Sequence, residues 1–331
     1  MDHVAVIGAG SWGTAVAALA ATQHPVVLWS RRPELAEVIN TTSENPDYLP
    51  GFRLPYGLRA TDDLDEATGG AALIAMAMPS HGFADVMSRM SPFRADVPLV
   101  SLTKGIEEAS LRRMTEVISE LRPGHDRERI GVLTGPNLAG EVVAGHPTAA
   151  VAGFIDDEAA GLVQKTFMGP TFRVYTNSDV VGCELAGSLK NVMAIAAGMS
   201  TGLGFGDNTR AALLTRALAE LTRLGVALGG QPATFAGLAG MGDLIATCTS
   251  VQSRNHRVGI GLAQGRKLDD IIDEMKMVAE GVKTTRAVLN LAQRAGVEMP
   301  IATQVARVLY EGHHPREAVM TLMTRQAKSE S

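Results

Sequence analysis

Aromatic residues, cysteine and net charge are all scarce in this sequence. Tryptophan, tyrosine and phenylalanine make up only 4% of the 331 residues, which argues against an aromatic binding platform. The formal net charge is −5, so nothing indicates a nucleic-acid partner or binding to an acidic membrane surface. The two cysteines, Cys183 and Cys248, have no metal-ligand spacing. We therefore expect reduced cysteines and no bound metal.

Long apolar runs are also rare. Val4–Ala21 is almost continuously apolar, but no basic segment precedes it, and Gly8, Gly10, Ser11 and Gly13 interrupt it, unlike a signal peptide. No other stretch approaches the roughly 18 uncharged apolar residues of a membrane span. We therefore expect a cytoplasmic protein without a transmembrane segment.

The pattern of apolar residues changes near residues 177–181, which predicts two domains, 1–179 and 180–331. Before this point, strand-like runs alternate with helical patterns, which predicts an α/β Rossmann-type doubly wound sheet. The predicted strands are Val4–Ile7, Val26–Trp29, Leu73–Met78, Leu99–Leu102, Ile130–Leu133, Thr148–Ala152 and Arg173–Tyr175. The predicted helices of this half are Thr14–Thr22, Pro33–Thr41, Phe83–Met90, Leu111–Leu121 and Asp157–Met168. The later segments predict an all-helical domain with helices over Glu184–Met199, Thr209–Leu228, Val282–Ala295 and Ile301–Tyr310.

The segment Gly8–Gly13 fits the pattern G-x-G-x-x-G directly between a predicted strand and a predicted helix. In a dinucleotide-binding domain Gly8 would allow a tight turn, Gly10 would let the pyrophosphate approach, and Gly13 would let helix and strand pack closely. The free amides of the helix N-terminus then face the diphosphate. We predict that this segment, the glycine fingerprint, binds a nicotinamide dinucleotide.

The residues that follow the second predicted strand indicate which nicotinamide cofactor is preferred. NAD sites usually carry an acidic residue there, but this chain has Ser30, Arg31 and Arg32, and no carboxylate before Glu34. The arginines could hold a 2′-phosphate, or they could simply be exposed at a helix start. We predict that NADPH is preferred and that NADH is the second option, without choosing between the two arginines.

Two lysines are candidates for the chemistry. Lys190 lies on a predicted helix whose same face carries small and apolar residues, and such surroundings lower the pKa of a lysine. A lysine of this kind suits acid–base catalysis, although it could also extend to solvent from a partly buried helix. Lys104 follows an apolar strand, where the carboxyl ends of parallel strands form a ligand-binding edge. It could be a substrate ligand or an ordinary surface lysine.

Together with the glycine fingerprint, five further motifs resemble the bacterial NAD(P)-dependent glycerol-3-phosphate dehydrogenase family, over the chain from His3 to about Gln326. The motifs are Leu189–Asn191, Gly202–Asn208, Gly240–Leu244, Ser253–Asn255 and Val278–Gly281. The resemblance implies reversible oxidation of sn-glycerol 3-phosphate to dihydroxyacetone phosphate, with the reverse direction supplying phospholipid synthesis. It also implies a small phosphorylated substrate.

The resemblance also implies residue roles. Lys190 would accept the proton in oxidation and donate it in reduction, Lys104 would contact the substrate oxygen, and Asp243 would hold both lysines. The lysines should lower each other's pKa, with Asp243 opposing this shift. The other implied substrate ligands are Arg254 and Asn255 at the phosphate, Ser253 beside them, and Gly135 and Asn137 in the pocket. The other implied cofactor contacts are Ser11, Trp12, Ala139, Val278 and Glu280, together with Lys104 and Arg254.

The chain departs from the family at Asn137-Leu138, where Ser or Thr followed by Phe is usual, and at Gly140, where a longer residue is common. We expect these changes to alter pocket detail and not the reaction class. Two alternatives stay open: a related β-hydroxyacid reductase, which the Arg254–Asn255 pair disfavours, and a non-catalytic dinucleotide sensor, which should have lost Lys190, Lys104 or Asp243. The apolar helical half suggests a homodimer.

Overall fold

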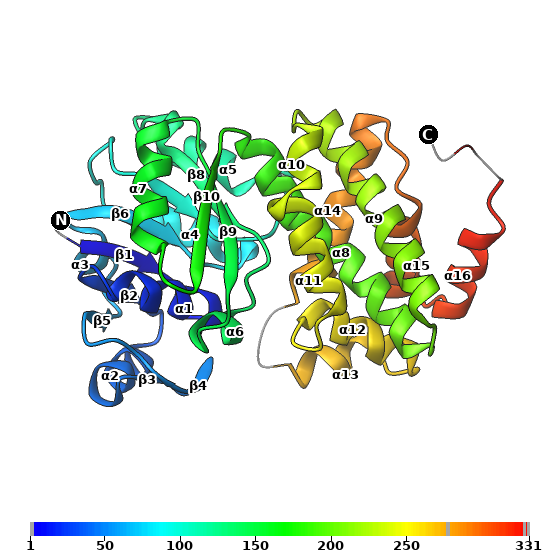
Figure 1. The fold of residues 1–331 in the computed structure, drawn as a ribbon, viewed down its shortest axis with the longest axis horizontal. Coiled ribbons are helices and arrows are strands. Elements are labelled where there is room, and N and C mark those ends of the chain that lie inside the picture. Colours follow the sequence, from blue (N-terminus) through cyan, green and yellow to red (C-terminus); the bar gives the residue numbers. More distant parts are fainter. Residues whose placement is uncertain (1–2, 276–278, 327–328, 330–331) are drawn as a thin grey trace.

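The protein consists of a sheet-containing half and a helical half that lie side by side (Figure 1). The computed structural model describes residues 3–275, 279–326 and 329. The strands are β1 (His3–Ile7), β2 (Val26–Trp29), β3 (Glu44–Asn45), β4 (Leu49–Arg53), β5 (Leu58–Thr61), β6 (Ala71–Met76), β7 (Leu99–Ser101), β8 (Ile130–Thr134), β9 (Thr148–Gly153) and β10 (Phe172–Asn177). The helices of this half are α1 (Ser11–Ala21), α2 (Pro33–Thr42), α3 (Leu64–Thr68), α4 (Ser80–Arg89), α5 (Met114–Leu121), η1 (Arg127–Arg129), α6 (Ala139–Val143) and α7 (Asp157–Phe167).

Eight strands form one sheet in the order β10-β9-β8-β7-β6-β1-β2-β5. All neighbours in the part β8-β7-β6-β1-β2-β5 pair in parallel. The prediction of a parallel sheet was wrong at one pairing, because β8 and β9 are antiparallel, with Val132 opposite Gly153. The connection between them contains only the 5-residue helix α6, which is too short to return the chain along a full strand. β10 then pairs in parallel with β9.

Helices cover both faces of this sheet, which confirms the doubly wound prediction. On one face α1, α2 and α7 bury side chains such as Val16, Leu35 and Val163 against the strands. On the opposite face α3, α4 and α5 bury side chains such as Phe83 and Ile118. The strands between them are therefore almost continuously apolar, as in β1 and β6.

The second half is built around one long central helix, α8 (Val180–Gly202), which is buried over nearly its whole length. The other helices are α9 (Asp207–Ala227), α10 (Pro232–Ala236), the π-helical turn η2 (Leu238–Gly242), α11 (Asp243–Thr249), α12 (Arg254–Ala263), α13 (Leu268–Asp273), α14 (Glu280–Ala295), α15 (Pro300–Glu311) and α16 (Pro315–Met323). Asp179 caps α8, because its carboxylate accepts the Gly182 N–H at 2.8 Å. β10 ends just before this cap, and the division into domains at 179/180 stays a prediction.

The helix α8 bears on the expectation that the chain has no transmembrane segment. It is long and apolar enough to cross a membrane by length and composition, with a mean hydropathy of 1.3, although it contains the charged residues Glu184 and Lys190. However, 94% of its apolar window is buried inside the protein. Its side chains pack with Leu221, Val258 and Val288, so α8 forms the core of the helical half.

Most predicted elements differ from the observed ones by one to four residues at an end, and several short elements were missed. The helix expected from Leu111 begins at Met114, because Leu111 has a left-handed φ of 62° and Arg113 still pairs with Ile106 in a β-bridge. The helix expected from Phe83 begins three residues earlier, as α4. The short strands β3, β4 and β5 were not predicted.

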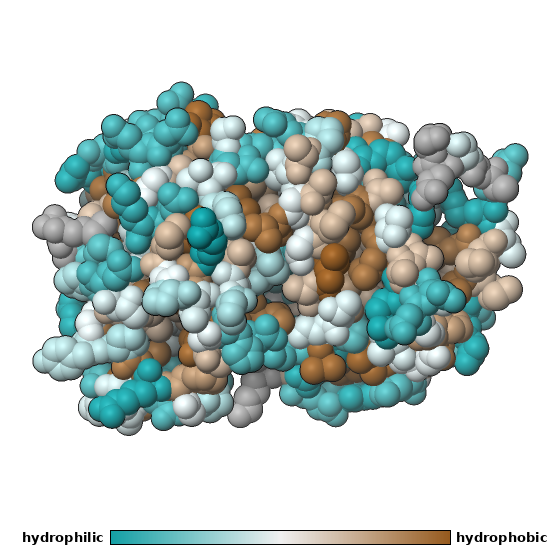
Figure 2. Space-filling model, in the orientation of Figure 1, coloured by the Kyte–Doolittle hydropathy of each residue, from teal (hydrophilic) through white to brown (hydrophobic). Residues whose placement is uncertain are grey.

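Large apolar side chains are also exposed on the helical half, and Figure 2 shows apolar surface over it on the face in view. They include Val226 on α9, Met241 in η2, Ile245 on α11 and Val251 in the following turn, with between 39% and 76% of their surface exposed. Exposed apolar surface of this kind is typical of contact sites between proteins.

Candidate active site

Three charged side chains meet where the carboxyl end of β7 faces helices α8 and α11. Lys190, in α8, donates to Asp243 Oδ1 at 2.7 Å, and Lys104, which follows β7, donates to Asp243 Oδ2 at 2.7 Å. The Asp243 side chain is buried, with 2% of its surface exposed. The structure thus brings together the three predicted catalytic residues, although Asp243 is 53 and 139 positions from the two lysines in sequence.

The two ammonium groups differ in the N–H donors that remain for a bound molecule. Lys104 uses all three of its N–H groups. Its acceptors are the Asp243 carboxylate at 2.7 Å, the Gly135 carbonyl at 2.9 Å and Asn137 Oδ1 at 2.7 Å. Lys190 donates to Asp243 and to the Thr247 hydroxyl, and its third N–H has no acceptor in the described part of the chain. Lys190 therefore has a donor to offer to a substrate.

The pKa of Lys104 is lowered to about 8. Burial is the largest cause, and the charge of Lys190 acts in the same direction, whereas the Asp243 carboxylate raises the pKa. These are the signs expected of the lysine pair, with burial as a further and larger contribution. Lys104 is thus protonated at neutral pH and loses its proton in the mildly alkaline range.

Asn137, the residue at which the chain departs from the family pattern, lies beside this site. Its amide oxygen accepts from Lys104, while its amide nitrogen is buried without a hydrogen-bond partner among the described residues. A buried donor without an acceptor costs about 1–3 kcal/mol, which a ligand oxygen can recover. The position is therefore still suited to contact a substrate.

A chain of side-chain amides holds the backbone around Lys104. Asn191 donates to the Lys104 carbonyl at 2.9 Å, Asn255 donates to Asn191 Oδ1 at 3.0 Å, and the Gly281 N–H donates to Asn255 Oδ1 at 2.9 Å. Asn255 is buried and has at most one N–H left for a ligand. Its other contacts link α8, α12 and α14, and the predicted contact of Asn255 with the phosphate stays a prediction.

The start of α12 presents a free cation. Ser253 caps the helix, because its hydroxyl accepts the His256 N–H at 3.3 Å. Arg254 is the first helical residue, is exposed, and has no hydrogen-bond or ion-pair partner in residues 3–275, 279–326 and 329. An unpaired guanidinium beside the free amides of a ten-residue helix is suited to bind an anion.

The glycine fingerprint has the close approaches that were predicted for it. A Cβ on Gly13 would lie 1.9 Å from the Gly8 carbonyl oxygen, and a Cβ on Gly8, whose φ is +122°, would lie 2.5 Å from the Ala77 oxygen. In contrast, a Cβ on Gly10 would meet nothing within 4 Å. The turn is therefore tight on its protein side and open where a pyrophosphate would approach.

Other predicted cofactor contacts surround this turn to different degrees. Ser11 donates to the Tyr48 carbonyl at 2.9 Å. Trp12 is half-buried with its ring 6.4 Å from that of Phe172, and Ala139 begins α6, which packs beside α1. Val278 lies outside the described residues. Ser11 and Trp12 follow the carboxyl end of β1 and Ala139 follows that of β8, so they lie at the same edge of the sheet as Lys104, which follows β7.

Glu280 has a partner that was not expected. Its carboxylate accepts from the Ser80 N–H at 3.0 Å and from the Ser80 hydroxyl at 2.7 Å. Ser80 begins α4 after β6, so this contact joins the helical half to the sheet at the carboxyl end of β6.

The two arginines after β2 are in different states. Arg32 forms an ion pair with Asp47 and lies over the Tyr48 ring at 5.8 Å. Arg31 is exposed and has no side-chain partner in the described part of the chain. Sequence reasoning did not find Asp47, because it follows α2 and not the strand end. It also gave no role to Asn191 or to Thr247, although Thr247 lies four residues after Asp243 on one helix.

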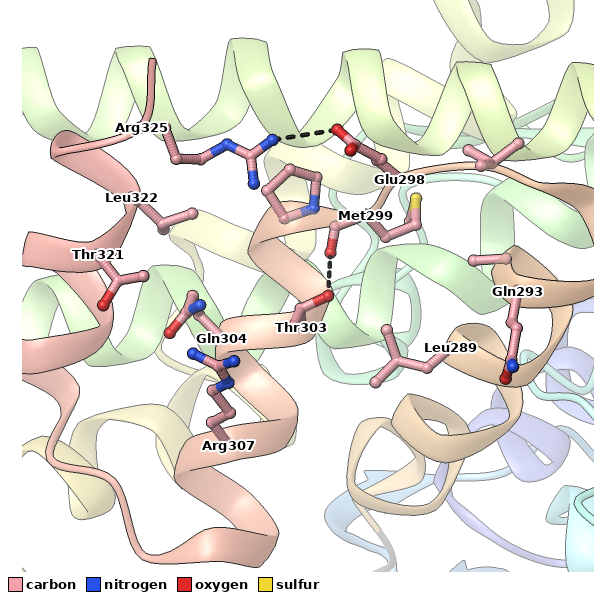
Figure 3. Close-up of a pocket in the computed structure, with 13 residues that line it drawn as sticks. Leu289, Gln293, Glu298, Met299, Thr303, Gln304, Arg307, Thr321, Leu322 and Arg325 are labelled. Atoms are coloured by element: carbon pink, nitrogen blue, oxygen red, sulfur yellow. Dashed lines mark hydrogen bonds and ion pairs between the residues drawn. The ribbon is translucent and has the colours of Figure 1, made fainter.

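A separate cavity of about 440 Å³ lies between α14, α15 and α16 (Figure 3). Arg325 and Glu298 form a 3.1 Å ion pair beside it, and Gln304 Oε1 is buried there without a hydrogen-bond partner among the described residues. None of the predicted site residues lines this cavity, so it is distinct from the lysine–aspartate site.

Known proteins share both halves of this chain. The family model described as the NAD-dependent glycerol-3-phosphate dehydrogenase N-terminus matches residues 3–160, and that of the C-terminus matches residues 179–320. The chain is 54% identical to glycerol-3-phosphate dehydrogenase [NAD(P)+] 2 of Sphingopyxis alaskensis over 91% of this chain and 90% of that one. It is 51% identical to a Geobacter glycerol-3-phosphate dehydrogenase [NAD(P)+] over 99% of both. The crystal structure of glycerol-3-phosphate dehydrogenase from Coxiella burnetii superposes with a TM-score of 0.93 at 39% identity, covering 98% of this chain and 99% of that one. The predicted resemblance is therefore confirmed: the chain belongs to the NAD-dependent glycerol-3-phosphate dehydrogenase family.

Proposed function

We propose that this protein interconverts dihydroxyacetone phosphate and sn-glycerol 3-phosphate with a nicotinamide dinucleotide, and that reduction supplies phospholipid synthesis. Family membership supports the reaction class. The observation that carries the proposal is the free N–H of Lys190 beside a fully paired Lys104. A proton donor in this state and the unpaired Arg254 nearby fit a substrate that has both a carbonyl and a phosphate.

The dinucleotide would be held by Gly8, Gly10 and the N-terminus of α1, because the turn leaves open space at Gly10 and is closed on its protein side. When bound, it supplies the hydride for reduction and accepts it in oxidation. Arg31 is the better candidate for the 2′-phosphate, because Arg32 is already paired with Asp47. A free arginine at this place supports a preference for NADPH, with NADH as second cofactor.

Lys190 moves the proton. In reduction its free N–H gives a proton to the carbonyl oxygen while hydride reaches the carbonyl carbon, so C=O becomes CH–OH; in oxidation the amine takes this proton back. Asp243 and Thr247 keep Nζ in place in both states. Lys104 stabilises negative charge on the oxygen through its own charge. To donate directly to that oxygen, Lys104 would have to give up one of its three present acceptors. The Gly135 carbonyl, at 2.9 Å the longest of the three bonds, is the one that it would exchange.

The phosphate would bind at the start of α12. Arg254 supplies a guanidinium that can donate two parallel N–H groups, and the first turn adds free backbone amides. The Ser253 hydroxyl is already used as the helix cap, and Asn255 has at most one free N–H. Arg254 should therefore contribute most of the phosphate affinity. A β-hydroxyacid without a phosphate would leave this cation unused, which disfavours that substrate class.

The test is NADPH oxidation with dihydroxyacetone phosphate, in the wild type and in Lys190→Ala. We expect activity in the wild type and a fall in kcat of about a thousandfold in the variant, the usual scale of a lost acid–base group. Lys165→Ala, on the exposed surface of α7, is the matched control and should keep full activity. Equal turnover in Lys190→Ala and the control would contradict the proton-transfer role, and no turnover in the wild type would contradict the substrate.

We further propose a cytoplasmic homodimer. Both cysteines are buried and unpaired, as is usual for proteins of reducing compartments. The exposed apolar residues of the helical half, among them Ile245 and Val251, support self-association. Analytical ultracentrifugation would give twice the chain mass of 34.8 kDa if this is right, and the single chain mass if it is wrong.

A further inference from the structure

The ion pair between Arg32 and Asp47 lies at the end of β2, where dinucleotide-binding sheets distinguish NADPH from NADH. Both side chains keep nearly half of their surface exposed, at 46% and 49%. The Arg32 guanidinium also lies 5.8 Å from the centre of the Tyr48 ring. One of the two arginines predicted to hold a 2′-phosphate is therefore neutralised by a carboxylate of this same chain.

Asp47 is held at this place by the glycine fingerprint itself. On one side of it, the buried Asn45 donates to the Ala9 carbonyl at 2.9 Å and to the Thr14 hydroxyl at 2.8 Å. On its other side, the Tyr48 carbonyl accepts the hydroxyl proton of Ser11 at 2.9 Å. The segment that carries Asp47 is thus tied to the turn that would bind the pyrophosphate, which fixes where its carboxylate lies relative to that turn.

The backbone of Arg32 is fixed as well. The buried Ser30 hydroxyl donates to the Arg32 carbonyl at 3.0 Å and accepts the Arg32 N–H at 3.2 Å. In contrast, the neighbouring Arg31 has no side-chain partner in the described part of the chain. The two adjacent arginines therefore contribute unequally: the charge of Arg31 is free to act on an anion, whereas the charge of Arg32 is balanced by Asp47.

We propose that Asp47 determines the balance between NADPH and NADH by neutralising Arg32 beside the fingerprint. This inference rests on the proposed use of a nicotinamide dinucleotide. A 2′-phosphate has to compete with the Asp47 carboxylate for the Arg32 guanidinium. NADH has no such phosphate and does not meet this penalty. A carboxylate is also the group that NAD sites use for ribose hydroxyls, and here it comes from the segment after α2.

The test is equilibrium binding of NADPH and of NADH, followed by nicotinamide fluorescence without any substrate. In Asp47→Asn we expect NADPH to bind about tenfold more tightly, as one regained charge-assisted contact to Arg32 predicts, and the Kd of NADH to change by less than about threefold. In an Arg32→Gln background the same substitution should change the Kd of NADPH by less than about threefold, because the arginine it releases is gone.

The matched control is Asp85→Asn, which changes the net charge equally but lies on α4, on the opposite face of the sheet, where Asp85 pairs with Arg89 at 3.8 Å. It should leave both Kd values unchanged. The inference is overturned by an unchanged NADPH Kd in Asp47→Asn, by an equal gain in Asp85→Asn, or by a full gain in the Arg32→Gln background. Binding does not depend on dihydroxyacetone phosphate, so failure of the proposed reaction would leave this test intact.

Discussion

The carboxylate of Glu220, in α9, is buried against the first turn of α15. It has 3% of its surface exposed and accepts the Ile301 N–H at 2.8 Å, with the Ala302 N–H at 3.5 Å. Burial raises the pKa of Glu220 to about 7, although both amides and the charges of Arg223 and Arg325 act in the opposite direction. We predict that Glu220→Gln removes a strong pH dependence from the stability of the helical half.

The sign follows from the raised pKa in the folded protein. The stabilisation from Glu220 is fully present below its ordinary pKa of 4.5 and is lost as the pH rises through about 7. A rise from 4.5 to about 7 corresponds to roughly 3 kcal/mol of unfolding free energy. The free energy of unfolding of the wild type should therefore fall by about that amount relative to Glu220→Gln between pH 4.5 and pH 8.

Urea unfolding, followed by far-ultraviolet circular dichroism at several pH values, measures this difference. The glutamine keeps an oxygen that can accept the Ile301 N–H, so the helix cap survives in the variant. Glu37→Gln, at an exposed position of α2, is the matched control and should give a curve parallel to that of the wild type. If Glu220→Gln also ran parallel to the wild type, the reasoning from burial would be refuted.

Two further predictions concern the site. Arg254→Ala should raise the KM for dihydroxyacetone phosphate about a hundredfold, because a charge-assisted phosphate contact is lost. The control Arg257→Ala, one turn further along α12, should change this KM less than threefold, and equal effects of the two variants would contradict the phosphate role. For reduction, kcat/KM should fall above about pH 8 as Lys104 loses its proton. Asn137→Ala removes an acceptor of the charged form, so the midpoint of this profile should move to lower pH, and an unmoved midpoint would show that Lys104 does not control it.

The elements that could be predicted from sequence are those in which burial alone determines the order of apolar and polar residues. Val26–Trp29 is a strand with the predicted bounds, because four consecutive apolar residues are buried on both faces of the sheet. In contrast, β3 and β4 are short and partly exposed, and β4 contains Pro50 and Gly51, which are unfavourable in strands. The direction of β9 could not be predicted either, because an apolar run has the same pattern in a parallel and in an antiparallel strand.

For the site, sequence motifs indicated the charged residues but not the partners that hold them. Lys190 and Asp243 were found through their motifs. The contact of Lys190 with Thr247 depends on how α11 packs on α8, and the contact of Asn191 with the Lys104 carbonyl joins residues 87 positions apart. The pairing of Arg32 with Asp47 likewise depends on a segment that crosses the fingerprint. Such contacts are set by tertiary packing, which no local pattern encodes.

The charges of the site also explain why its two lysines share one carboxylate. Two ammonium groups and one carboxylate leave one positive charge in surroundings where the Asp243 side chain is 2% exposed. An unbalanced buried charge costs stability, so a second carboxylate would make the free protein more stable. It would also cancel the field that favours a negative charge on the substrate oxygen. In the proposed reaction the excess positive charge would stabilise an oxygen that gains negative charge during hydride transfer, and Lys190 would neutralise this oxygen by giving its proton.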